Sequence, residues 1–212
     1  MKILSVTSLA LPEVKVVRFA RFRDHRGYFA ESFQRVDFRE HPELSFLWDY
    51  QFVQTNESYS RAGTLRGLHF QCDPPQGKLV RTLHGHLVDI VVDIRKESPT
   101  RGRGIMYDMP NDDEAPFGEW IWVPPGFAHG TWFPAPSRIE YLCSALYNAS
   151  AEGAISPFCP HLDWSACDRP LKARFDAFVS NPGLLMSEKD RAGISLPAWL
   201  ADPRSGRFDE AC

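Results

Sequence analysis

Short runs of β-forming residues, separated by turn signals, fill the chain from Val14 to about Tyr147. The clearest of these runs read VKVVRF, FVQTN, KLVRTL, HLVDIVVDIR, EWIWVPPG and IEYLCSALY. Runs of this length, bounded by turn signals, are typical of strands in a barrel or a sandwich. The pattern therefore predicts a mostly β fold.

Helical periodicity is scarce by comparison. Its clearest segment runs from Val36 to Glu43, with Asp37 as a candidate N-cap and Pro42 as a stop signal. An Asp side chain accepts a hydrogen bond from a free backbone N–H of the first turn, and proline interrupts a helix interior. The sequence therefore predicts only a short helix in this part of the chain.

The pattern changes after Tyr147, where Pro-rich polar sequence follows with Trp164 and Phe175 as apolar anchors. A chain of 212 residues is within the usual size of one all-β domain. We expect a single domain over residues 1–190 and a tail over residues 191–212. The tail is expected to pack on the barrel and to fray at its very end.

Composition places the chain among soluble globular proteins. Hydrophobic residues make up 43% and charged residues 24%, and no stretch approaches eighteen consecutive apolar residues, so no membrane span is expected. The formal net charge is −3 and the basic residues are scattered, which argues against nucleic acid as a partner. The short apolar run at the start leads through Pro12 into a strand-like segment, and we do not expect it to be a signal peptide.

The five cysteines form an odd set without CxxC spacing. This argues against a disulfide framework and against a thiolate zinc site. A reducing compartment, the cytoplasm, is the expected location.

Two neighbouring segments carry the first candidate chemistry. LRGLHFQ contains Arg66 and His69, and QGKLVR brings Lys78 into the next predicted strand. A His and a Lys on adjacent strands can share one face, where a base would lie beside a cation that stabilises developing negative charge. On the spacing alone, a core His and a surface Lys are the more common interpretation.

A second histidine lies in WVPPGFAHGTW, where Pro124, Pro125 and Gly126 predict a rigid turn before His129. Tyr141 and Tyr147 follow at even spacing, which would point both phenols to one face of an extended strand. Such phenols either take part in chemistry or pack with a hydrogen-bonded tip.

His84 and His86 are spaced as H-x-H, a pattern that can hold iron, manganese or zinc in a β-barrel. Gly85 between them favours the turn of a hairpin, which would place the pair beside a loop. We therefore expect no metal site here.

Arg26 lies at a predicted turn before an alternating segment. Its guanidinium suits a phosphate, and pairing with Asp24 is the equally weighted alternative. The motifs GxGxxG, GxxxxGK[ST], GxSxG and HExxH do not occur, so the sequence gives no support for dinucleotide redox chemistry, nucleotide hydrolysis or serine hydrolysis.

Taken together, these segments closely resemble the dTDP-4-dehydrorhamnose 3,5-epimerase family of the cupin class, from about residue 14 to residue 190. So many matching segments, in the same order and with the same residues, are improbable by accident. The matching segments are DHRGYFAESF (24–33), FVQTNESYS (52–60), LRGLHFQ (65–71), QGKLVR (76–81), VDIVVDIRKESPTRG (88–102), VPPGFAHG (123–130), the strand from Tyr141 to Tyr147, and SEKD (187–190).

The resemblance implies a cupin-type jelly-roll β-barrel with a few short helices, working as a homodimer without metal or other cofactor. It implies epimerisation at C3 and C5 of a nucleoside diphosphate 4-keto-6-deoxyhexose, in deoxysugar and cell-surface polysaccharide biosynthesis. By position, His69 corresponds to the catalytic base, Asp190 to its orienting carboxylate and Lys78 to the enolate-stabilising group. Tyr147 corresponds to the acid that returns the proton. The positions that match sugar- or nucleotide-binding residues of the family are Arg26, Glu31, Gln54, Asn56, Arg66, His129 and Tyr141.

Several alternatives stay open at this point. SPFCPHLDW departs from the family pattern, so the contacts that close the barrel could differ there. PNDDEAPFG and residues 191–212 also depart from it and could reshape the dimer surface or the nucleotide end of the pocket, so cytidine or guanosine could replace thymidine as the nucleoside. A relative that inverts only C3 or only C5 would use the same groups. Outside epimerases, a catalytically silent cupin that binds a sugar nucleotide and a metal-dependent cupin oxygenase are the rivals.

Overall fold

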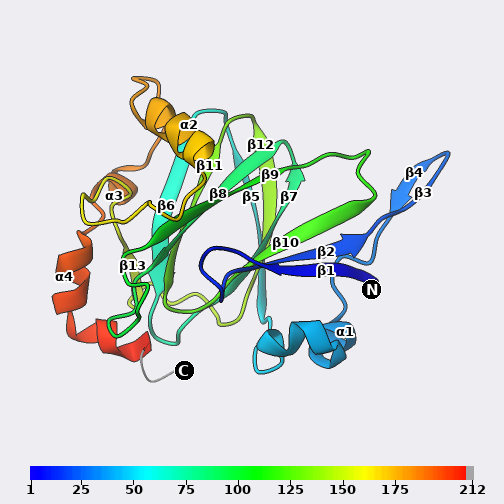
Figure 1. Cartoon of the computed structure of the whole chain (residues 1–212), viewed down its shortest axis with the longest axis horizontal. Coiled ribbons are helices and arrows are strands. Elements are labelled where there is room, and N and C mark those ends of the chain that lie inside the picture. The colour runs from blue at the N-terminus through cyan, green and yellow to red at the C-terminus, as the bar shows by residue number, and fades with distance from the viewer. Residues whose placement is uncertain (209–212) are drawn as a thin grey trace.

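Two antiparallel sheets face each other in the computed structural model, which describes residues 1–208 (Figure 1). The larger sheet has six strands, in the spatial order β1 (Ile3–Ser8), β2 (Lys15–Ala20), β10 (Phe117–Val123), β7 (Lys78–His84), β12 (Ser137–Cys143) and β5 (Gln54–Ser60). The smaller sheet has five, in the order β13 (Glu152–Ala154), β6 (Thr64–Gln71), β11 (Phe127–Phe133), β8 (His86–Asp93) and β9 (Gly104–Pro110). The predicted jelly roll is confirmed, although its two sheets are not joined into a closed ring.

Inward-facing apolar side chains of both sheets form the core between them, because alternate residues of a strand point to one face. The larger sheet contributes Val16, Val80, Ile121 and Ile139 to this cluster, and the smaller sheet contributes Leu87, Val91, Ile105, Phe127 and Phe133. The strand pattern seen in the sequence therefore reflects a two-layer core.

The outer face of the smaller sheet is covered by the last third of the chain. The helical elements there are α2 (Arg169–Val179), α3 (Glu188–Arg191), α4 (Leu196–Ala201) and the 3₁₀ helix η2 (Pro203–Phe208) (Figure 1). Trp199 is fully buried, packs on Phe70 with ring centroids 4.3 Å apart, and donates its indole N–H to the Ile94 carbonyl. Residues beyond 190 thus contribute to the core, while the predicted fraying falls on residues 209–212, outside the described part. The domain boundary at residue 190 stays a prediction.

The outer face of the larger sheet carries the short helix predicted near residue 36. Helix α1 spans Arg35–Glu40 and is followed by the 3₁₀ helix η1 (Pro42–Leu47). The predicted N-cap was wrong, because the Gln34 side chain accepts the N–H of Asp37. Pro42 ends α1 as predicted but also begins the 3₁₀ helix, where a missing N–H is tolerated.

A two-stranded hairpin leaves the body of the molecule between β2 and α1. It consists of β3 (Phe22–Asp24) and β4 (Gly27–Phe29) and projects away from both sheets (Figure 1). Within residues 1–208, no helix is long and apolar enough to cross a membrane.

Candidate active site

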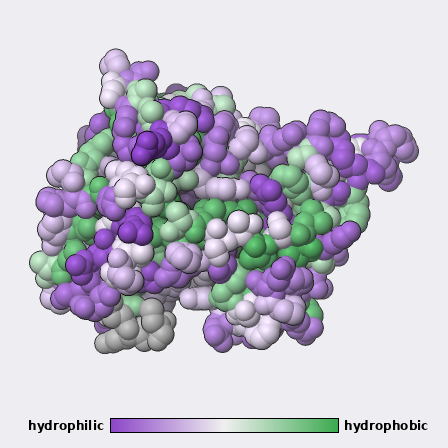
Figure 2. Space-filling model, viewed as in Figure 1, coloured by the Kyte–Doolittle hydropathy of each residue, from purple (hydrophilic) through white to green (hydrophobic). Residues whose placement is uncertain are grey.

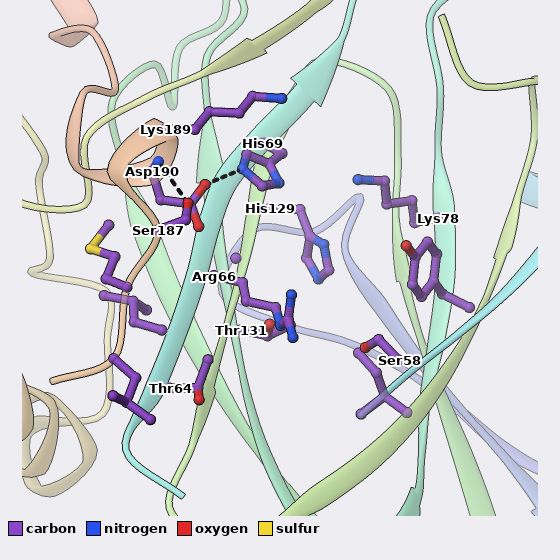
Figure 3. Close-up of a pocket in the computed structure, with 16 residues that line it drawn as sticks. Ser58, Thr64, Arg66, His69, Lys78, His129, Thr131, Ser187, Lys189 and Asp190 are labelled. Carbon is purple, nitrogen blue, oxygen red and sulfur yellow. Dashed lines mark hydrogen bonds and ion pairs between the residues drawn. The ribbon is translucent and has the colours of Figure 1, made fainter. Parts of the chain in front are cut away.

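A cavity of about 610 Å³ opens between the two sheets (Figure 3). We call it the main cavity. Strands of both sheets and the segment that leads into α3 line it. Its polar lining residues are Ser58, Thr64, Arg66, His69, Lys78, His129, Thr131, Tyr141, Ser187, Lys189 and Asp190.

His69 and Asp190 form a hydrogen-bonded pair on one wall of the main cavity. His69 comes from β6, and its Nε2 lies 2.6 Å from Oδ1 of Asp190, which is only 5% exposed. Asp190 is held in α3, where its backbone N–H donates to the Ser187 side chain at the helix N-cap. A carboxylate on one ring nitrogen fixes the imidazole orientation and directs Nδ1 to the cavity as the nitrogen with a free lone pair.

The surroundings of His69 favour a neutral imidazole. Burial is the largest effect and lowers the pKa of His69 below its ordinary value of 6.5, while the Asp190 carboxylate opposes this and the Lys78 ammonium adds to it. A neutral ring at neutral pH is the form that can accept a proton.

Lys78 faces His69 from the opposite sheet (Figure 3). It begins β7 in the larger sheet, whereas His69 lies on β6 in the smaller sheet. The two residues therefore share a cavity, as predicted, but not the face of neighbouring strands, because the chain crosses between sheets from β6 to β7. Burial lowers the pKa of Lys78 from its ordinary value.

His129 forms a second histidine–carboxylate pair. It lies on β11, is 8% exposed, and its Nε2 donates to Oδ2 of the fully buried Asp89 on β8 over 2.8 Å. The predicted turn precedes this strand, with Gly126 at φ +86°. His129 is held deep in the main cavity between His69 and Lys78 as seen in Figure 3.

Arg66 and Tyr141 also line the main cavity. Arg66 donates from Nε to the Ser60 hydroxyl over 2.9 Å, which fixes its guanidinium near Thr131 (Figure 3). Tyr141 comes from β12 in the other sheet, and burial raises the pKa of its phenol. A fixed guanidinium and a protonated phenol are suited to hold oxygen atoms of a ligand.

A smaller cavity of about 110 Å³ adjoins the main one and shares His69, Lys78 and Tyr141 with it. Its other polar lining residues are Gln54, Asn56, Gln71, Gln76, Cys143, Tyr147 and Glu152. The Gln54 amide donates to the Asn56 side chain over 3.0 Å, so these two predicted ligand-binding residues lie side by side.

The predicted strand from Tyr141 to Tyr147 ends early. Strand β12 stops at Cys143, because Ser144 exchanges hydrogen bonds with Gly77 and turns the chain away. The expectation of two phenols on one strand face was therefore wrong. Tyr147 reaches the smaller cavity from a loop, and the residue is 55% exposed.

The phenol of Tyr147 is hydrogen-bonded to Glu152, which also pairs with Lys189. Its hydroxyl donates to Oε2 of Glu152 over 2.9 Å, and the Lys189 ammonium donates to the same oxygen over 2.5 Å. The hydrogen bond to Glu152 raises the pKa of Tyr147. Tyr147 is thus a protonated phenol at neutral pH.

Arg26 and Glu31 lie outside both cavities of their own chain. Arg26 is at the tip of the β3–β4 hairpin, where its guanidinium pairs with Asp24 over 2.6 Å. Glu31 follows the hairpin and pairs with the amino group of Met1 over 3.1 Å. The Asp24 alternative from the sequence is therefore the arrangement found here.

The H-x-H pair flanks a hairpin turn, as expected. Gly85 has φ +86° between β7 and β8, and His86 Nε2 lies 2.5 Å from Oδ1 of Asp108. Neither His84 nor His86 lines the main cavity. Residues 1–208 contain no group of three or more His, Cys, Asp or Glu side chains arranged to hold a metal ion.

This arrangement can remove and return a proton beside a ketone. A neutral His, a cation opposite it and a protonated phenol all line the same pair of cavities. The family model for dTDP-4-dehydrorhamnose 3,5-epimerase matches residues 8–197 of the chain. The chain belongs to this family.

Individual epimerases agree with that assignment. The dTDP-4-dehydrorhamnose 3,5-epimerase of Shigella flexneri is 40% identical over 192 residues, which cover 90% of this chain and 94% of the relative. The relative from Sinorhizobium fredii (strain NBRC 101917 / NGR234) is 43% identical over 145 residues, covering 67% of this chain and 70% of its own. The crystal structure of dTDP-6-deoxy-D-glucose-3,5-epimerase from Legionella pneumophila Philadelphia 1, in complex with dTDP-4-keto-L-rhamnose, superposes with a TM-score of 0.78 at 32% identity, covering 95% and 96% of the two chains.

Sequence reasoning missed three charged residues at this epimerase-family site. Asp89 is a buried acid in the apolar run HLVDIVVDIR, and that contrast was the available signal, since a buried carboxylate requires a partner. Glu152 and Lys189 gave no comparable signal. Their meeting depends on β13 pairing with β6 and on the position of α3.

Proposed function

We propose that this chain epimerises a nucleoside diphosphate 4-keto-6-deoxyhexose of the dTDP-4-dehydro-6-deoxyglucose type, inverting C3 and C5. The observation that carries the proposal is the placement of His69, oriented by Asp190, opposite Lys78 in one cavity. A protein that only binds a sugar nucleotide has no need of a base, a cation and a phenol in this arrangement.

Removal of a proton next to a ketone requires stabilisation of the resulting enolate. The negative charge spreads onto the carbonyl oxygen, and Lys78 is the cation that meets it. Donors fixed in place before the reaction contribute about 3–4 kcal/mol each in comparable sites. The half-buried position of Lys78 strengthens the interaction, because solvent screens it less.

His69 acts as the base through Nδ1. As the ring gains the proton it becomes an imidazolium, which the Asp190 carboxylate at Nε2 stabilises. Inversion then needs a proton from the other face of the sugar, and Tyr147 is the acid that supplies it. A well-placed acid or base contributes roughly 10²–10⁴-fold in rate.

The remaining polar residues hold the substrate. Arg66 and His129 face the sugar in the main cavity, while Gln54 and Asn56 line the smaller one with Tyr141. The structure with bound dTDP-4-keto-L-rhamnose from Legionella pneumophila supports a thymidine diphosphate sugar as the ligand. The product serves deoxysugar and polysaccharide biosynthesis.

The enzyme works as a homodimer. Strand β1 is an edge of the larger sheet, and Figure 2 shows hydrophobic residues gathered near the centre of the face on which β1 and β2 run. The neighbouring hairpin exposes Phe22 and Phe29, which a partner chain would cover. In such a dimer the hairpin carries Arg26, followed by Glu31, towards the partner's cavity, which would give both residues their predicted contact with the nucleotide sugar.

We place the reaction in the cytoplasm. The thiols of Cys72, Cys143, Cys159 and Cys167 are free and buried, which supports a reducing compartment.

The variant His69→Ala tests the proposal. Wild-type protein is expected to convert dTDP-4-keto-6-deoxyglucose to dTDP-4-keto-L-rhamnose, followed by proton NMR of the sugar. The variant is expected to lose this conversion, by at least about 10²-fold for a missing base, while still binding dTDP in calorimetry. Full turnover by His69→Ala would overturn the proposed mechanism.

A further inference from the structure

Glu152 connects the two sides of the site. It lies on β13, directly opposite Gln71 of β6, while Ala154 of the same strand pairs with His69. Its Oε2 accepts hydrogen bonds from the Tyr147 phenol and the Lys189 ammonium. Lys189 adjoins Asp190 in α3, so Glu152 links the phenol to the element that orients the histidine.

The Tyr147 ring needs such an anchor. It lies in a loop beyond the end of β12 and is 55% exposed, so few packing contacts fix its direction. Its backbone N–H is held by Oε1 of Gln54 over 3.0 Å. The bond to Gln54 holds the backbone of Tyr147, whereas the bond to Glu152 holds the hydroxyl group that would donate the proton.

Glu152 has the charge and the rigidity for this task. Its side chain is only 15% exposed and belongs to a paired strand. Burial alone would raise the pKa of Glu152, but the hydrogen bonds from Lys189 and Tyr147 outweigh burial and lower it. Glu152 is therefore an ionised acceptor at neutral pH, and Lys189 holds it in place.

We propose that Glu152 is a positioning residue for Tyr147, which holds the phenol at the cavity lined by His69 and Lys78 so that the proton is returned to one face of the sugar. The inference rests on the proposed epimerase function and adds a residue to it. Lys189 contributes indirectly, because its ammonium group holds the Glu152 carboxylate in place.

The proton balance needs no additional reactant. In the resting site the Tyr147 O–H donates to Glu152. During the reaction this O–H turns about its C–O bond and gives its proton to the enolate carbon. The phenolate that remains takes a proton from solvent, to which Tyr147 is exposed, and the His69 imidazolium releases to solvent the proton that it removed from the sugar. The net exchange of protons with solvent is zero, and Glu152 stays ionised throughout.

Two rates distinguish positioning from general structural support. Deuterium uptake at C3 and C5 in D₂O reports proton removal by His69, and formation of the inverted sugar reports proton return by Tyr147. Glu152→Ala is expected to lower inversion about 10- to 100-fold, as for a misplaced reacting group, and to leave uptake of deuterium within roughly twofold. Glu152→Gln keeps an acceptor for the phenol and is expected to recover most of the inversion. Lys189→Met is expected to show a smaller loss in the same direction.

A double variant tests whether Glu152 acts through the phenol. In a Tyr147→Phe background, Glu152→Ala is expected to cause no further loss of inversion, because residues that act through one another are not additive. Asp176→Ala is the control, since it removes a carboxylate–lysine ion pair away from both cavities, with Lys172 on α2. It is expected to leave both rates unchanged.

The outcomes separate this inference from the function on which it rests. If uptake and inversion fall in parallel in Glu152→Ala and Lys189→Met, or if the double variant loses more than Tyr147→Phe, the positioning role is wrong. Wild-type protein that neither exchanges nor inverts the sugar would instead overturn the epimerase function itself.

Discussion

At His69, burial and the Asp190 carboxylate act on the pKa in opposite directions, which makes the pair with Asp190 testable by pH. Burial lowers the pKa of His69 below 6.5, and Asp190 partly restores it. The base is neutral above this lowered pKa, so kcat/KM is expected to hold through neutral pH and to fall only as the pH drops through the His69 pKa.

Asp190→Asn removes the group that raises the pKa. The acidic limb of the kcat/KM profile is therefore expected to move to lower pH, while the plateau falls by roughly 10²–10⁴-fold because the imidazolium loses its carboxylate. Initial rates measured between pH 4 and pH 9 check both effects. An acidic limb that moves to higher pH in Asp190→Asn would contradict the hydrogen bond between His69 and Asp190.

Tyr147→Phe separates the two halves of the reaction. Loss of the hydroxyl is expected to impair inversion by about 10²-fold or more and to leave proton removal by His69 in place. Deuterium uptake into recovered substrate, measured beside product formation, checks this. Tyr59→Phe is the control, because Tyr59 is exposed on β5 and lines neither cavity. Exchange that falls in step with inversion would argue against Tyr147 as the acid.

Single residues were predictable where their chemistry stood out from the local pattern. His69, Lys78 and His129 are polar positions in strand-like runs, and the structure brings all three into one cavity. Tyr147 also reaches the site, although through a loop that the even spacing did not indicate. The partnership of Glu152 with Lys189 joins residues 37 positions apart through tertiary packing, which local pattern does not contain.

Among the secondary-structure elements, the sequence predicted the strands but not the C-terminal helices. The strands are visible in the sequence as short β-rich runs that end at turn signals, as in EWIWV of β10, which Pro124, Pro125 and Gly126 follow. Helix α2, with eleven residues, is longer than the one helix that the sequence predicted. Its signals were present, with Asp168 as N-cap and Pro170 in the first turn, but the surrounding Pro-rich sequence concealed them.

Strands β6 and β11 approach each other closely beside the two histidines, and glycine permits this. A Cβ at Gly130 would lie 2.8 Å from the Arg66 carbonyl oxygen and 2.5 Å from the Leu68 side chain. Facing it, Gly67 has φ +103°, which other residues rarely adopt.

Gly130→Ala is therefore expected to force the two strands apart and to destabilise the fold by about 1–3 kcal/mol, as overpacking does. Activity is expected to fall as well, because His69 and His129 are carried by these strands. Thermal unfolding and turnover check both, against Gly206→Ala, where nothing lies within 4 Å of the added Cβ. An equal Tm for the two variants would show that β6 and β11 can move apart without loss of stability, and would contradict the prediction.

At the scale of the whole molecule, the succession of β-rich runs and turn signals predicted a β sandwich or barrel, and the family resemblance narrowed this fold class to a jelly roll. The assignment of strands to sheets did not follow from order along the chain. Strands β6 and β7 are consecutive but lie in opposite sheets, and this crossing places His69 and Lys78 on facing walls. How far apart two facing sheets lie depends on the side chains packed between them, and no single run of residues specifies that packing.

The exposed hairpin and the free edge of β1 predict a dimer in solution. Size-exclusion chromatography with light scattering at micromolar concentration is expected to give the mass of two chains. Arg26→Ala is expected to leave that mass unchanged and to raise KM for the nucleotide sugar, because its guanidinium would reach the partner's cavity. A monomeric mass with full activity would contradict the dimer and the role of the hairpin.

The central claim is that His69 removes protons next to the ketone of a nucleotide sugar while Lys78 holds the enolate. Proton NMR of wild-type protein in D₂O with dTDP-4-keto-6-deoxyglucose follows the C3 and C5 signals directly. Loss of both signals, with appearance of the inverted sugar, is the predicted result, and loss of only one would identify an enzyme that inverts a single carbon. Persistence of both signals under conditions where the sugar nucleotide binds would contradict the account.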